Sequence, residues 1–129
     1  NTLDMVEEMR FAALLPKGSL HNPEAVNART ALRMATINGA KALGIHHLTG
    51  SLEVGKRADL IVIHADASNM LPIYDVYSAI VYASNSKNIR SSMVNGKWIM
   101  RNRELMNINK TETMESMKHI VNSQTDNRK

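Results

Sequence analysis

The stretch Gly50–Ile63, GSLEVGKRADLIVI, contains the feature that most constrains the fold, an apolar run behind a basic turn. From Ala58 to Ile63 the one polar side chain is that of Asp59. Such a strand presents apolar groups to both faces of the sheet it joins, as strands with a layer on each side do. The sequence therefore predicts a strand over residues 58–63 that is covered on both faces.

The composition is that of a globular protein. The 129 residues, 43% hydrophobic and 22% charged, suffice for one domain with its own core. There is no cysteine, which excludes disulfides, thiolate metal sites and a cysteine nucleophile. No apolar run approaches the roughly 20 residues that span a bilayer, and the early acids in NTLDMVEEMR do not resemble a signal peptide. These features predict a cytoplasmic protein with no membrane partner.

The net charge of +4 does not indicate nucleic-acid binding. The Lys and Arg residues are scattered, and aromatic side chains make up 4% of the chain, so none are interleaved with the cations for stacking on bases. We therefore expect no nucleic-acid partner. The chain opens on Asn1 instead of Met, from which we expect a segment of a longer protein.

Two helices are predicted in the first third of the chain. Residues 3–15 have apolar side chains at helical spacing, and Pro16 is expected to end that helix. The second covers 22–44, with Asn22 as its cap, an interruption at Asn38-Gly39, and Gly44 closing it.

The remainder is predicted to be rich in strands, with two further helices. Strands are expected over 50–55 and 58–63, and on both sides of Asn95-Gly96, a dipeptide typical of a two-residue hairpin turn. A short helix near 75–83 has Asp75 as its cap. A last helix is expected after Asn109, which stands in capping-box spacing with Glu112. This helix has an apolar face that includes Met114 and Met117, and it is expected to fray after Val121.

No complete catalytic site is predicted in this chain. The five histidines form neither a His-x-His pair nor a His-Glu-x-x-His helix: His21, His46, His47, His64 and His119. His64 and Asp66 share a face, which we interpret as a strand becoming polar where it leaves the core. The serines lack the Gly-x-Ser-x-Gly setting of a nucleophile, and Lys56-Arg57 does not match a phosphate-binding loop. Glu7 and Glu8 face apart on their helix, so they do not form a catalytic carboxylate pair. We therefore predict no catalytic, substrate-binding or metal-binding residue.

Four stretches resemble the C-terminal portion of the metal-dependent amidohydrolase superfamily: LDMVEEMRFAALLPKG, ALRMATINGAKALGI, GSLEVGKRADLIVI and SSMVNGKWIMRNRELM. The resemblance covers roughly residues 1–121 in family order. It is greatest to the branch of methylthioadenosine and S-adenosylhomocysteine deaminases and the related triazine chlorohydrolases. The family fold is a (β/α)8 barrel with a small β-sandwich, and a barrel of about 250 residues cannot fit in this chain.

The resemblance implies an α/β segment with three parts. Residues 1–47 would hold barrel-closing helices, 48–106 a β-sandwich segment with the helix near 75–83, and 107–129 a C-terminal helix with a frayed tail. Strand 58–63 would then be a middle strand of the sandwich, paired with strands from an N-terminal segment of the parent.

The resemblance also implies the parent's chemistry. It would be a hydrolytic deaminase or chlorohydrolase that acts on a C–N or C–Cl bond of a purine-like or triazine-like ring, with zinc or a similar divalent metal. The metal ligands would lie upstream of Asn1, so the 129 residues would hold no cofactor and be inactive alone. Asp4 falls past the metal position, and we interpret it as an acid at a helix N-terminus.

Two further expectations concern partners and turns. The remainder of the parent chain would be the main partner, with self-association through exposed apolar surface. The alternative is a non-catalytic β-rich module that self-associates through a sheet edge and the helix of Met114 and Met117. The chain also departs from the family, because Asn102-Arg103 stands where Asp-Gly is frequent, and Arg adopts positive φ reluctantly.

Overall fold

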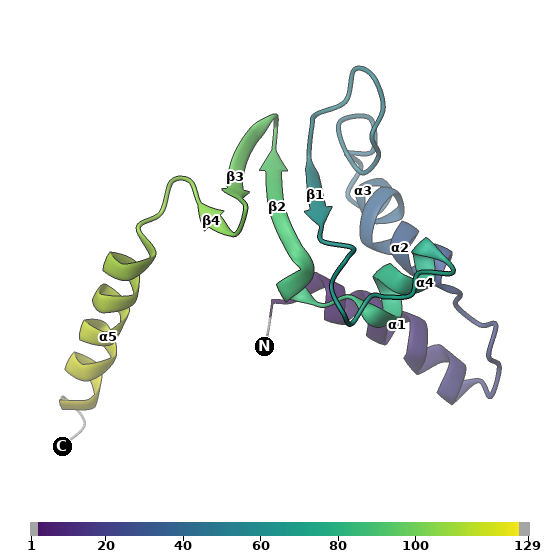
Figure 1. Cartoon of the computed structure of the whole chain (residues 1–129), viewed down its shortest axis with the longest axis horizontal. Helices are drawn as coiled ribbons and strands as arrows, with labels where there is room; N and C mark the ends of the chain where they lie inside the picture. Colours follow the sequence, from purple (N-terminus) through teal and green to yellow (C-terminus); the bar gives the residue numbers. More distant parts are fainter. Residues whose placement is uncertain (1–2, 127–129) are drawn as a thin grey trace.

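The computed structural model describes residues 3–126, with side chains as far as residue 123. It is a mixed α/β structure in which a helical layer lies beside an antiparallel sheet, and the last helix stands apart from both (Figure 1). The helical elements are α1 (Met5–Ser19), α2 (Ala28–Arg33), the π-helix η1 (Met34–Asn38), α3 (Gly39–Ala42), α4 (Val76–Ser78), the π-helix η2 (Ala79–Ala83), the 3-10 turn η3 (Ser86–Asn88) and α5 (Lys110–Asp126). The strands are β1 (Leu60–Ile63), β2 (Ile89–Val94), β3 (Lys97–Arg101) and β4 (Glu104–Leu105).

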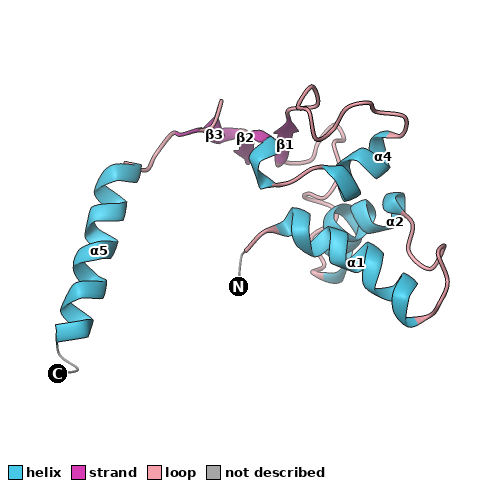
Figure 2. Cartoon of the chain, turned by 60° about the horizontal axis from the view of Figure 1, so that its bottom comes forward, coloured by secondary structure: helices cyan, strands magenta, loops and turns pink. Residues whose placement is uncertain are grey.

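The core lies where α1, α2 and η2 meet (Figure 2). It is built from five buried side chains, three of them alanines: Met9, Ala13, Ala28, Ala31 and Val81. Small residues allow the helices to approach closely, so little apolar area is needed to join them. The Arg10 guanidinium adds a polar link, donating to the carbonyl oxygens of Val81 and Ser84.

The predicted end of the first helix is wrong. The helix continues through Pro16 to Ser19, because the Leu20 amide donates to the Pro16 carbonyl at 3.0 Å and keeps the last turn closed. Proline removes a single backbone donor and its fixed φ is compatible with a helix, so it weakens the ladder without ending it.

The predicted start of the second helix is also wrong. It begins at Ala28, with the Asn27 side chain accepting from the Thr30 amide at 2.9 Å. Asn22, the expected cap, accepts instead from the Glu24 amide in an isolated turn. The interruption lies at Thr36 (φ −126°, ψ −106°) within η1, shortly before Asn38-Gly39, and the predicted closure at Gly44 is confirmed by its φ of +72°.

The sheet has the order β1-β2-β3-β4 with antiparallel neighbours. The hairpin prediction is confirmed, because Asn95 and Gly96 join β2 to β3 with φ of 48° and 76°. The predicted strand over 50–55 is wrong. Gly50 and Gly55 have φ of +93° and +92°, and the loop between them is closed by side chains, with Lys56 Nζ 2.6 Å from Ser51 Oγ.

The strand over 58–63 exists as β1, but it lies at the edge of the described sheet. Ile61 and Val62 are 54% and 40% exposed, so the expected cover on both faces is not provided by residues 3–126. The barrel and the second sheet of a sandwich stay predictions.

The two remaining helices follow their caps. Over 75–83, α4 and η2 start where the Asp75 carboxylate accepts from the Ser78 amide at 2.7 Å, which confirms that helix. Asn109 accepts from the Glu112 amide at 3.3 Å and begins α5 as predicted. That helix runs to Asp126, so the fraying expected after Val121 is wrong for residues 122–126, and residues 127–129 lie outside the described part. No helix among the described residues is both long and apolar enough to cross a membrane.

Candidate functional site

The histidines examined as metal ligands are spread over the molecule. His21 follows α1, His46 and His47 follow α3, His64 follows β1, and His119 lies in α5. Among the side chains described, those of residues 3–123, no three of His, Asp or Glu are placed so that they could hold one metal ion. Protein zinc sites use three or four such ligands, so the described side chains do not fit a zinc centre.

The structure does bring together His64 and Asp66. The distance from His64 Nε2 to Asp66 Oδ1 is 2.5 Å, and both side chains are largely exposed. Two ligands on an open surface are too few for a metal site, so this is a surface pair at the end of β1.

Asp4 caps α1. Its Oδ1 accepts from the amides of Val6 at 2.9 Å and Glu7 at 3.3 Å, which satisfies two of the donors that a helix N-terminus leaves free. Glu7 and Glu8 follow in the same turn, at the positive end of the helix dipole. These three acids therefore stabilise the N-terminal end of α1.

The buried serines also have structural roles. Ser84 Oγ donates to the Ile80 carbonyl at 2.6 Å, and Ser91 Oγ accepts from the Asn102 amide at 3.1 Å. A nucleophilic serine needs a base to take its proton, and here both hydroxyls are bonded to backbone.

Three carboxyl groups have lowered pKa values, each for a local reason. Hydrogen bonds from the Ser51 hydroxyl and the Lys56 ammonium lower the pKa of Glu53. The Asn95 amide and then the Thr49 hydroxyl lower that of Asp59, and the Ser78 hydroxyl and amide lower that of Asp75. A general acid near neutral pH needs the opposite shift, so these carboxylates stabilise turns.

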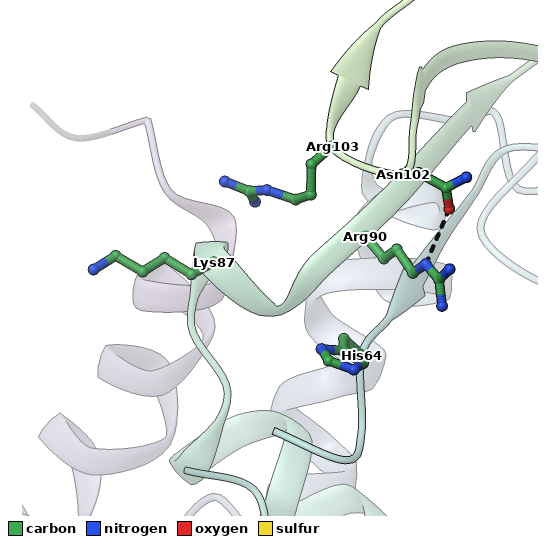
Figure 3. A pocket seen from close by; sticks show the side chains of 5 residues that line it. All are labelled: His64, Lys87, Arg90, Asn102 and Arg103. Atoms are coloured by element: carbon green, nitrogen blue, oxygen red, sulfur yellow. Dashed lines mark hydrogen bonds between the residues drawn. The ribbon is translucent and has the colours of Figure 1, made fainter. Parts of the chain in front are cut away.

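A cationic hollow lies where β1 ends, β2 begins and β3 turns into β4 (Figure 3). It has a volume of ≈ 380 Å³ and five lining residues: His64, Lys87, Arg90, Asn102 and Arg103. In the sequence, His64 was considered as a metal ligand and Asn102-Arg103 as an unusual turn. The pairing of the strands brings these residues beside Lys87 and Arg90.

A family model described as the amidohydrolase family matches residues 1–99. The chain belongs to the amidohydrolase family. Its sequence is 41% identical over 121 residues to a 5-methylthioadenosine/S-adenosylhomocysteine deaminase of Acetivibrio thermocellus, covering 94% of this chain and 28% of the relative. It is 40% identical over 122 residues to a 5'-deoxyadenosine deaminase of Methanobrevibacter smithii, again covering 94% and 28%.

Solved amidohydrolase-type structures share this fold. An adenosine deaminase of Xanthomonas campestris with bound zinc aligns with a TM-score of 0.87 at 34% identity, over 89% of this chain and 26% of that one. An atrazine chlorohydrolase of Arthrobacter aurescens complexed with zinc aligns with a TM-score of 0.73 at 27% identity, over 94% and 25%. The resemblance predicted from the sequence is thus confirmed at the level of the superfamily and of both related branches.

This amidohydrolase chain spans about a quarter of the length of the relatives that it matches. The zinc of the solved relatives belongs to those proteins. The described side chains of this chain do not fit a zinc centre, so a metal and an activity can only be proposed for the whole protein.

Proposed function

We propose that this chain is the C-terminal part of a metal-dependent hydrolytic deaminase that acts on adenosine-type nucleosides. The observation that carries the proposal is the 41% identity over 121 residues to a 5-methylthioadenosine/S-adenosylhomocysteine deaminase. In the proposed reaction a water molecule supplies the oxygen that replaces the ring amino group, and ammonia leaves. The metal ligands and the groups that move protons would be supplied by residues outside the 129.

The part of this chain in that enzyme is structural. Helices α1 to α3 would close the barrel, and β1 to β4 would form one side of the sandwich. The exposure of Ile61 and Val62 on β1 supports this role, because a strand with bare apolar faces and a free edge is suited to receive another strand. The remainder of the parent chain is therefore the proposed partner.

The test is an assay of the full-length gene product with divalent metal present. Ammonia release is measured with 5'-methylthioadenosine, S-adenosylhomocysteine and 5'-deoxyadenosine, and chloride release with atrazine. We expect ammonia from one or more nucleosides and no product from residues 1–129 assayed alone. A full-length protein that releases chloride and no ammonia would belong with the chlorohydrolases. A full-length protein that is inactive on all four substrates would refute the proposal.

The alternative of a self-associating, non-catalytic module receives no support from the relatives, which are enzymes by name. The non-catalytic alternative predicts that the full-length gene product releases neither ammonia nor chloride in the same assay. The expectations of a cytoplasmic location and of no nucleic-acid partner stay predictions.

A further inference from the structure

The cationic hollow holds three positively charged side chains that have no described carboxylate partner. Lys87, Arg90 and Arg103 contribute three formal positive charges, and none of its five lining residues is acidic. The ion pairs among the described residues are Lys56–Glu53 and His64–Asp66, so no described carboxylate lies within 4.0 Å of these three cations. Like charges repel, so an anion bound among these cations would be stabilised by all three.

Arg103 occupies a backbone position that disfavours arginine. Its φ is +70°, next to Asn102 at +49°, in the tight turn between β3 and β4. Positive φ crowds a side chain against its own backbone, so residues other than Gly persist there only when other contacts hold them. Arg103 is held by its guanidinium, whose Nη1 donates to the carbonyls of Ser86 at 3.0 Å and Ile89 at 3.1 Å.

These bonds orient the guanidinium without using all of it. Five N–H donors are available on arginine, and Nη1 provides the two bonds to the backbone. Arg90 is held in a similar way, with Nε donating to Asn102 Oδ1 at 3.0 Å. Both guanidinium groups are thus fixed through one nitrogen and keep further donors, an arrangement that is pre-organised for an oxyanion.

The cations of the hollow form two groups. In Figure 3 Lys87 and Arg103 extend in the same direction, whereas Arg90 stands beside Asn102 and His64 and points the other way. A carboxylate presents two oxygens in one plane and suits one arginine fork. A phosphate group presents oxygens in several directions with up to two negative charges, and so can accept from Lys87 and Arg103 together.

We infer that this hollow is a binding site for a phosphate group, either free phosphate or the phosphate of a small molecule. Its volume of ≈ 380 Å³ lies near the lower end of ligand pockets, which hold about 300–1,000 Å³. The site is separate from the proposed deaminase chemistry, and its test measures binding without turnover. Failure of one proposal therefore leaves the other standing.

The test is isothermal titration of the full-length gene product with inorganic phosphate, at an ionic strength held constant with chloride. Saturable binding is expected, weakened by about tenfold or more in Lys87→Gln, because one charge-assisted contact is lost. The Lys87 side chain is exposed and its ammonium makes no described bond, so the substitution does not disturb the fold. Lys87→Glu, which reverses the charge, is expected to abolish binding.

Lys97→Gln is the matched control, since Lys97 is an exposed lysine on β3 outside the hollow. It should bind phosphate as the unmodified protein does. Equal weakening in both lysine variants would mean that phosphate only senses net charge, and the absence of saturable binding at constant ionic strength would equally overturn the site. A second titration with adenosine 5'-monophosphate identifies the source of the phosphate, and it is repeated in Lys87→Glu because the proposed deaminase site would itself bind an adenosine group. Binding that is tighter than that of inorganic phosphate and is lost in Lys87→Glu points to a nucleotide in the hollow, and equal binding points to the free ion.

Discussion

At the scale of single residues, Asp4 lies close to the metal position of the family but acts as a helix cap. It is the acid nearest to the point where the family resemblance places a metal ligand, yet its carboxylate accepts from the amides of Val6 and Glu7. An oxygen committed to two backbone donors is a cap. The sequence was sufficient for this interpretation because Asp4 directly precedes an amphipathic run that starts a helix.

Replacing Asp4 tests the two roles against each other. Asp4→Ala should lower the unfolding free energy of the full-length protein by about 1 kcal/mol, the usual cost of a lost cap, and Asp4→Ser should recover most of it. Metal content, measured by elemental analysis of the purified protein, should be unchanged in both variants. Loss of metal in Asp4→Ser, which keeps the cap, would identify Asp4 as a ligand.

Asp59 provides a pH-dependent link between β1 and the hairpin. Its Oδ1 accepts from the Asn95 amide at 2.6 Å, which lowers the pKa of Asp59 in the folded protein. Because the folded pKa lies below the unfolded value of about 3.9, the stabilisation is present above that pH and is lost as pH falls through the folded pKa. The difference between the unfolding midpoints of the unmodified protein and Asp59→Asn should therefore be fully present at about pH 5 and should shrink as the pH falls below about 3.9. A constant difference over this range would contradict the assignment.

At the scale of elements, local signals predicted the turns better than the helix boundaries. The Asn95-Gly96 hairpin depends on one dipeptide, so it could be predicted. The start of α2 could not, because Asn22 and Asn27 are equally good caps by residue type, and burial of Ala28 and Ala31 against α1 favours the later one. The cationic hollow could not be predicted for the same reason, because its residues come from separate elements and meet only through the pairing of β1 with β2 and of β2 with β3.

Two glycines offer a matched test of backbone conformation. A Cβ at either Gly96 or Gly18 would meet no atom within 4 Å, so the substitution effect comes from the backbone alone. Gly96 has φ of +76°, and Gly96→Ala should lower the unfolding free energy by about 1–2 kcal/mol. Gly18 lies within α1, and Gly18→Ala should raise it by up to about 1 kcal/mol. Thermal or denaturant unfolding of the full-length variants measures both, and changes of the same sign would contradict the assigned geometry.

At the scale of the whole molecule, the chain exposes more surface than a compact protein of its size. Its accessible surface is 9940 Å², whereas a folded monomer of 14.4 kDa exposes about 6,800 Å². Exposed apolar side chains lie on β1 and α5, and also on α1 and in the loops, and α5 stands away from the rest in both views (Figures 1 and 2). The described residues do not supply the cover that was predicted for β1, so its second layer stays a prediction.

The surface excess leads to a prediction for residues 1–129 expressed alone. The isolated chain should bind a hydrophobic dye such as ANS and self-associate, with a molar mass in light scattering that rises with protein concentration, whereas the full-length protein should bind little dye. The physical reason is that Ile61, Val62, Met114 and Met117 are all at least 40% exposed, and association is the means by which such groups leave water.

Two substitutions identify the face that causes the association. Ile61→Lys places a charge on the free edge strand, which blocks strand addition, and Met117→Lys interrupts the apolar face of α5. If the β1 edge is where the remainder of the parent normally pairs, Ile61→Lys should reduce association of the isolated chain and also weaken folding of the full-length protein, whereas Met117→Lys should have the smaller effect on folding. A compact monomer that binds no dye would instead favour an independent module, because a chain that satisfies its own surface needs no parent.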